Sequence, residues 1–271
     1  MARSPLASRR RARARAAFGL CAMLLPGACS TWCGAGHLPR HGCSEAWLAG
    51  LRPHLERPGQ LAVEATMLAS LPALLVYDND IHAELFEDQT LTGGDTKTGT
   101  DLQIGLAVAA LSLGGVRLAG GDDGRDLEVA AESVAATGAV TALLKVAVQR
   151  ERPQSETRAS FPSGHTSISF ASATFLARTL ADQGDEWYWK LGYASLLPAT
   201  WVGLSRVEGN RHFLADVVAG ALIGVFATNT IYDAHYGAGS GQGIFGAPEG
   251  WSLEVAPAEG GGIAFGLSVR F

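Results

Sequence analysis

Two residues in the second half of the chain have the types and spacing of a nucleophilic pair. His212 and Asp216 are four positions apart at the start of a predicted helix, so both side chains lie on one face. The carboxylate can accept a hydrogen bond from one ring nitrogen, which leaves the other nitrogen as a lone-pair nucleophile. A His–Asp pair at this spacing is usually structural, so further residues must decide the chemistry.

A second histidine lies in the segment Phe-Pro-Ser-Gly-His-Thr-Ser at residues 161–167, which leads into an apolar helical stretch. Ser163 is a predicted helix N-cap, and Gly164 lets a ligand approach the backbone closely. Free N–H groups and the positive end of the helix dipole would then face an anion. His165 is placed at the rim of this anion site, where it could protonate a leaving oxygen; the alternative is a capping or turn residue.

Two cations precede this segment. Lys145 and Arg152 are seven residues apart, which is two helical turns, so both project from one face of a helix that Pro153 helps to end. A solvated helix face is the ordinary explanation of such a pair. Beside an anion site, the same pair could bind the anion.

A helical framework must position these residues. From about Leu61 the chain consists of apolar helical stretches separated by polar, Gly-rich joints. The pattern predicts an all-α fold, a helical bundle of about six core helices. We expect them near residues 61–76, 101–118, 126–149, 164–181, 187–205 and 212–232.

The last nine residues, 263–271, alternate apolar with small or polar side chains, which is a strand pattern. Residues 251–255 could pair with them across Gly260–Gly262 as a small C-terminal β-hairpin. The ending also resembles that of outer-membrane barrel proteins, but one strand cannot make a barrel.

Composition limits the classes of partner. The chain has 271 residues and 28.2 kDa, 47% apolar and 17% charged residues, and a mean hydropathy of +0.14, which excludes a disordered chain or a coiled coil. Its net charge is −5, and six of its 21 Lys and Arg lie in the first fifteen residues. Nucleic acid is therefore a poor partner.

The N-terminus has the features of an export signal. An apolar run from Ala16 to Leu25 follows the arginines; it is too short to span about 30 Å of hydrocarbon but suits a secretory signal. Small residues then precede Cys29, which predicts either lipidation of Cys29 and membrane association through it, or ordinary cleavage between Ala28 and Trp32. We divide the chain into an export signal (1–29), an N-terminal extension (30–60), a bundle (61–235) and a tail (236–271).

All four cysteines lie in the first 43 residues. Cys33 and Cys43 would remain after processing, and an oxidising envelope compartment favours a local disulfide between them. The alternative is a metal held with His37 and His41, but the spacing matches no zinc-finger pattern.

The helices could be soluble or could span a membrane. Three of their longest uncharged runs, 103–116, 191–205 and 217–232, hold 14, 15 and 16 residues, against the roughly 20 that a span requires. We therefore expect an exported, soluble bundle in the periplasm or outer envelope, with an integral membrane protein as the alternative. Trp187 and Trp189 could lie at a membrane interface or in the core, and we favour the core.

Three motifs follow in order: Lys-x6-Arg-Pro from Lys145, Pro-Ser-Gly-His from Pro162, and Ser-Arg-x5-His-x3-Asp from Ser205. This combination resembles the type 2 phosphatidic acid phosphatase family, whose superfamily includes bacterial non-specific acid phosphatases and vanadium-dependent haloperoxidases. All three motifs match without substitution over residues 145–216, and the neighbouring apolar helices look like the helical bundle of that family. The resemblance weakens before residue 100 and after residue 235.

The resemblance implies a phosphate site that needs neither metal nor cofactor. Lys145, Arg152 and Arg206 would bind the phosphoryl oxygens and spread the charge of the transition state. Ser163 and Gly164 would add hydrogen bonds from the helix start.

It also implies the division of the catalytic work. His212 would attack phosphorus to give a phosphohistidine, and Asp216 would orient it and balance its charge. His165 would protonate the leaving alcohol and then activate water.

The resulting hypothesis is an exported phosphatase that hydrolyses phosphate monoesters or diphosphates, carried by a lipid or a small molecule. A vanadium-dependent haloperoxidase is one alternative, because vanadate fits the same cationic pocket. A catalytically silent envelope protein is another, although here no nucleophile or cation of the motifs is missing.

Overall fold

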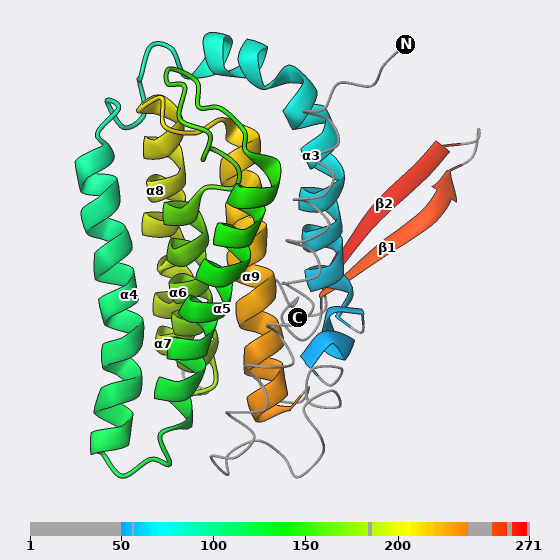
Figure 1. Ribbon diagram of the computed structural model, residues 1–271. Helices are drawn as coiled ribbons and strands as arrows, with labels where there is room; N and C mark the ends of the chain where they lie inside the picture. Colours follow the sequence, from blue (N-terminus) through cyan, green and yellow to red (C-terminus); the bar gives the residue numbers. More distant parts are fainter. Residues whose placement is uncertain (1–49, 56, 184–185, 238–250, 259–261, 270–271) are drawn as a thin grey trace, which may run out of the picture.

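The computed structural model describes residues 50–55, 57–183, 186–237, 251–258 and 262–269. The predicted all-α fold class is confirmed, and the described helices form a bundle (Figure 1). Their bounds are α3 (Pro58–Leu85), α4 (Thr96–Ala119), α5 (Arg125–Val148), α6 (Gly164–Ala181), α7 (Glu186–Ala194), α8 (Leu196–Glu208) and α9 (Leu214–Tyr236).

Two helices differ from the sequence prediction. The single helix expected over 187–205 is divided into α7 and α8 at Ser195, whose hydroxyl donates to the carbonyls of Gly192 (2.6 Å) and Ala173 (3.0 Å). Helix α3 continues nine residues beyond the expected end at residue 76. The prediction stopped there because the apolar pattern gives way to Asp, His and Glu side chains, some of which bind other parts of the bundle.

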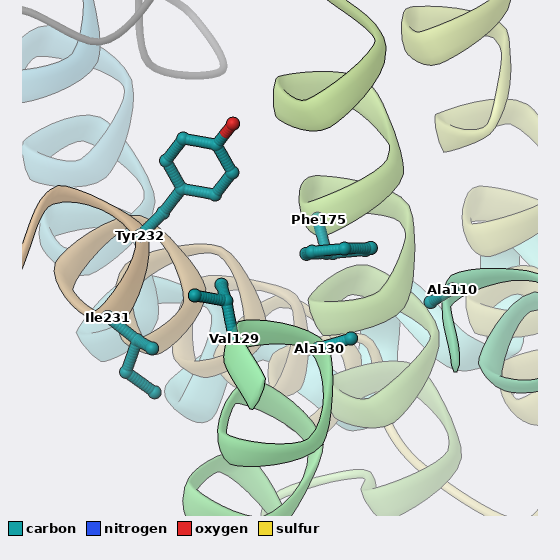
Figure 2. Close-up of a cluster of buried hydrophobic side chains, with 6 residues drawn as sticks. All are labelled: Ala110, Val129, Ala130, Phe175, Ile231 and Tyr232. Atoms are coloured by element: carbon teal, nitrogen blue, oxygen red, sulfur yellow. The ribbon is translucent and has the colours of Figure 1, made fainter. Parts of the chain in front are cut away.

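The core surrounds α6 and α9. Figure 2 shows Phe175 of α6 facing side chains of α9 and α5, with Ala110 of α4 beside them. Helices α6 and α9 approach closely because α9 has glycines on the facing side. A Cβ atom at Gly220 would lie 2.6 Å from the Ser163 carbonyl oxygen, and one at Gly224 would lie 2.4 Å from that of Ser167.

Beyond the bundle, β1 (Trp251–Ala258) and β2 (Gly262–Val269) pair antiparallel, with Trp251 opposite Val269 and Ala258 opposite Gly262.

Among the described helices, four are long and apolar enough to cross a membrane by length and composition: Gly59–Leu85, Thr96–Ala119, Arg125–Val148 and Leu214–Tyr236. They hold 27, 24, 24 and 23 residues, with mean hydropathies of 1.4 to 1.7. The expectation of a soluble bundle counted only uncharged runs, and those runs are shorter than the helices that contain them. The expectation that Trp187 is a core residue was wrong, since this side chain is 78% exposed.

One end of the bundle, which we call the site end, collects the termini of six helices. There α3, α5 and α8 end, and α4, α6 and α9 begin (Figure 1, top). The opposite end, where α3 begins and α9 ends, is called the far end. The predicted export signal, Cys29, and the cysteine and histidine set of residues 33–43 lie outside the described residues.

Candidate active site

The predicted site residues come from four helix termini at the site end. Lys145 is in the last turn of α5, His165 in the first turn of α6, Arg206 in the last turn of α8 and Asp216 in the first turn of α9. Because α6 and α9 both begin here, the positive ends of two helix dipoles add to the charge of the arginines and the lysine. The sequence motifs are therefore brought together in space.

The pKa of His165 reflects this convergence of positive charge. Burial, followed by the neighbouring cation Arg206 and by smaller contributions from His212, Arg152 and Lys145, lowers the pKa of His165 to about 4. An imidazole in this field is neutral at pH 7 when no anion is bound. A bound dianion would oppose the field and raise the pKa of His165 toward the range of a working acid.

Two arginines in this region have buried nitrogen atoms without a partner. Nε of Arg152 and Nε of Arg206 make no hydrogen bond, while Nη2 of Arg206 donates to Thr100 Oγ1 at 2.7 Å. Burial, followed by the charge of Arg211, lowers the pKa of Arg206 to about 10, which keeps it a cation at neutral pH. Within the described ranges, neither arginine forms an ion pair with a carboxylate, so the site carries uncompensated positive charge.

Lys145 has a different arrangement from that of the arginines. Its Nζ donates to the carbonyl oxygens of Pro162 (2.5 Å), Ala159 (2.7 Å) and, at longer range, Ser160 (3.4 Å). It therefore fixes the loop that leads into α6. To reach a phosphoryl oxygen, Nζ would have to release or share one of these carbonyls.

Ser163 is the N-cap of α6, as predicted. Its fully buried Oγ lies 3.5 Å from the Thr166 backbone nitrogen and 2.8 Å from Thr166 Oγ1. At Gly164, a Cβ atom would meet Thr141 and Lys145 only at 3.7 and 3.8 Å, which are ordinary contacts. The protein itself thus leaves space beside Gly164 on the approach to the helix start.

The pair of His212 and Asp216 departs from the prediction in two ways. His212 lies before α9, which begins at Leu214, rather than in the helix. Its Nδ1 is 3.7 Å from Asp216 Oδ2, too far for a direct hydrogen bond, and has no other partner. The expected hydrogen bond is absent because Oδ2 already accepts from Ser160 Oγ (2.5 Å) and the Phe213 backbone N–H (2.9 Å).

His212 is 3% exposed, and burial is the largest cause of its lowered pKa, which Asp216 partly offsets. A lowered pKa keeps the imidazole neutral, the form that retains a lone pair. Since Nδ1 faces Asp216, Nε2 is the nitrogen free to react.

Comparison with known proteins identifies the family of this domain. Residues 129–239 match the model of the PAP2 superfamily. The chain contains a PAP2 superfamily domain. No solved structure matches the chain significantly.

Curated relatives of this chain are named as phosphatases. The chain is 41% identical over 80 residues to the "Probable diacylglycerol pyrophosphate phosphatase 1" of Schizosaccharomyces pombe, a match covering 27% of this chain and 29% of the relative. It is 33% identical over 132 residues to the "Lipid A 1-phosphatase" of Porphyromonas gingivalis (48% and 29%) and 34% identical over 139 residues to the "Lipid phosphate phosphatase 1" of Arabidopsis thaliana (38% and 42%). The matched segments thus span less than half of each of these relatives.

Sequence reasoning missed three residues around Asp216. Ser160 donates to it, and Arg150 Nη1 pairs with its Oδ1 at 2.8 Å. Arg150 Nη2 also pairs with Asp78 Oδ2 at 2.7 Å, on a helix that precedes the matched PAP2 range. Arg150 lies inside the Lys-x6-Arg motif and could have been singled out as a third cation. Nothing in the local pattern marks Asp78.

No group of three or more His, Cys, Asp and Glu side chains that could hold a metal occurs in the part of the chain that the structure describes.

Proposed function

We propose that the chain is a phosphatase that hydrolyses phosphate monoesters or diphosphates of lipids through a phosphohistidine intermediate. The observation that carries the proposal is the position of two neutral imidazoles, His165 and His212, among three cations that lack a carboxylate ion-pair partner within the described ranges. Such a site is arranged to bind a dianion and to react with it.

In the first step, Nε2 of His212 attacks phosphorus in line with the bond to the leaving oxygen. Before this step, the bound dianion raises the pKa of His165, which takes up a proton from solvent. The N–P bond forms as the P–O bond breaks, and His165 gives this proton to the departing alkoxide or phosphate. Arg152 and Arg206 stabilise the charge on the equatorial oxygens. Asp216, 3.7 Å from Nδ1, stabilises the positive charge that develops on the ring.

In the second step, His165 has lost its proton and serves as a base. It takes a proton from a water molecule, whose oxygen attacks the phosphohistidine. The N–P bond breaks, inorganic phosphate leaves and His212 returns to its neutral form. The two histidines thus need no group other than water to complete the cycle.

The surface of the bundle supports a lipid substrate. Helix α4 carries outward apolar side chains, including Val108 (55% exposed) and Val116 (69% exposed). Large apolar side chains on the outside of a candidate span suit hydrocarbon better than water. We therefore infer an integral membrane protein, the alternative of the sequence analysis.

The position of the site along these helices fits a lipid headgroup. Lys145 is three residues from the end of α5 and Asp216 is two residues from the start of α9, both candidate spans. A reactive phosphate would therefore meet the protein near the level where headgroups lie, while its acyl chains remain among the helices. The printed names of the relatives, which concern lipid phosphates, point to the same class.

The test is phosphate release by the full chain purified in detergent. Phosphatidate, diacylglycerol diphosphate, an isoprenoid diphosphate and a soluble aryl phosphate would be compared, each with excess chelator and with added divalent metal. We expect lipid phosphates to be preferred and chelator to have no effect. Activity that disappears with chelator and returns with metal would contradict the mechanism.

The intermediate can be tested separately by turnover of a substrate labelled in its phosphoryl group, quenched in alkaline detergent. The label should be retained by the protein, be stable in base and labile in acid, as a phosphoramidate is, and be absent from the His212→Ala variant.

A further inference from the structure

Helix α3 (Pro58–Leu85) precedes the matched PAP2 range, yet it contacts the segment that carries the nucleophile. Asp78 and His82 are four residues apart, on one face of α3. Asp78 Oδ1 accepts from the Ala215 backbone N–H at 3.1 Å, and His82 Nε2 lies 2.6 Å from Asn210 Oδ1. Helix α3 thus binds the chain both before and after His212, at Asn210 and at Ala215.

Arg150 joins this face of α3 to Asp216. Its Nη2 is 2.7 Å from Asp78 Oδ2 and its Nη1 is 2.8 Å from Asp216 Oδ1. The guanidinium also lies over the Phe213 ring, 4.2 Å from the centroid. One cation is therefore held between two carboxylates that are 2% and 0% exposed and by an aromatic ring that directly follows His212.

This arrangement fixes the rotation of the Asp216 carboxylate. With Oδ1 bound to Arg150, Oδ2 is directed toward Ser160, the Phe213 N–H and His212 Nδ1. Without Arg150, two buried carboxylates would face each other without a shared cation, and Asp216 would lose one of the contacts that set its direction.

We propose that Asp78 and Arg150 are positioning residues that hold Asp216, and through it His212, in the geometry of in-line attack. Helix α3 would then contribute to the active site through Asp78. The proposal rests on the proposed function, because it concerns the same nucleophile. Residues that orient a reactive group through one intermediate partner typically change activity by about 10- to 100-fold.

The far end of the bundle supplies a matched control. Arg57, the residue before α3, also bridges to α9, through Asp233 at 2.8 and 3.1 Å. Arg57 and Asp233 thus join α3 to α9 through an arginine–aspartate pair, at the end of the bundle opposite His165 and His212. Arg57→Gln therefore reports what the loss of an α3–α9 ion pair does to stability alone.

The experiment compares Arg150→Gln, Arg150→Lys, Asp78→Asn and Arg57→Gln in the full chain, with an aryl phosphate as substrate. We expect Arg150→Gln to lower kcat by about 100-fold and Asp78→Asn by about 10-fold, with KM within threefold of wild type. Arg150→Lys should have a kcat about tenfold higher than that of Arg150→Gln, because lysine restores the positive charge but cannot bind both carboxylates as the guanidinium does. Arg57→Gln should keep kcat within threefold at a temperature where all variants are folded.

Two further measurements identify the step and separate the proposals. The rate of labelled phosphoenzyme formation should fall with kcat in Arg150→Gln. In an Asp216→Asn background, Arg150→Gln should cost far less than in wild type, because its effect acts through Asp216. A normal kcat in Arg150→Gln, or equal losses in Arg150→Gln and Arg57→Gln, would overturn the inference. If wild type forms no His212-dependent phosphoenzyme, the proposed function itself fails, whatever the Arg150 variants do.

Discussion

The two ends of the bundle differ in how far carboxylates compensate the charge of their arginines. At the far end, Asp233 is fully buried and accepts from Arg57 and, at 2.6 Å, from Arg178, while His235 pairs with Glu132 at 2.7 Å. At the site end, Arg150 pairs with Asp78 and Asp216, whereas Arg152 and Arg206 form no ion pair with a carboxylate of the described residues. Compensated charge holds helices together, whereas uncompensated charge in a folded protein is most simply explained by a ligand of opposite sign.

The largest expected effect separates two buried histidines, one at each end of the bundle. His212→Ala should reduce kcat by about 10⁴-fold or more, because no other side chain of the motifs can form the covalent intermediate. His235→Gln, at the far end, should keep kcat within about threefold. Turnover of an aryl phosphate measures both, and one tenth of wild-type activity in His212→Ala would contradict the phosphohistidine mechanism.

The second effect contrasts two buried arginines. Arg206→Gln should lower kcat/KM by about 10²- to 10³-fold, because a cation that stabilises the transition state is lost. It should leave the thermal stability in detergent unchanged or raised, since it removes an uncompensated charge. Arg178→Gln should instead lower the free energy of unfolding by about 3 kcal/mol, because it removes one partner of the buried Asp233. A large loss of stability in Arg206→Gln would contradict this contrast.

A smaller effect concerns His165 and pH. In the empty site the pKa of His165 is lowered to about 4, and a bound dianion raises it. Activity in the first step needs the protonated form, so it is lost as pH rises through this pKa. The alkaline limb of kcat, which reports the complex, should therefore lie at higher pH than that of kcat/KM, which reports the free enzyme.

The same residue should also discriminate between leaving groups. His165→Ala should lose about tenfold more activity on alkyl phosphates than on aryl phosphates, which depart with less protonation. Equal losses on both classes would exclude His165 as the general acid.

The smallest effect is a ligand-induced shift in melting temperature. Vanadate or phosphate should raise the melting temperature of wild type in excess chelator by a few degrees, since an oxyanion compensates the charge at the site end. The shift should vanish in Arg206→Gln and persist in Arg57→Gln. A shift of equal size in both variants would place the anion elsewhere.

The comparison also explains what the sequence could and could not predict. Lys145, Arg152, His165 and Arg206 lie close to helix termini in short motifs. The family resemblance that these motifs carry predicted a common phosphate site, and the termini do meet. The end of α3 was placed too early because the prediction followed apolar periodicity, and the polar residues beyond residue 76 include Asp78, which binds 72 positions away along the chain.

The spacing of His212 and Asp216 predicted proximity correctly but not the hydrogen bond. The spacing rule considers only the two residues of the pair and no other donors. In the structure, Ser160 Oγ and the Phe213 backbone N–H already donate to Asp216 Oδ2. The length of the candidate spans was underestimated for a related reason. Uncharged runs were counted in isolation, whereas residues such as Lys145 are accommodated at the helix end by loop carbonyls.

The close contact of α6 and α9 has a mechanical consequence. There is no room for a methyl group between Gly220 or Gly224 and the backbone of α6, so the two helix backbones are in direct contact at these glycines. Sliding one past the other by a turn, about 5.4 Å, would require the backbones to separate first. Helix α6, which bears His165, and helix α9, which bears Asp216, therefore move as one rigid unit. The distance between His165 and Asp216 stays constant while substrates enter and products leave.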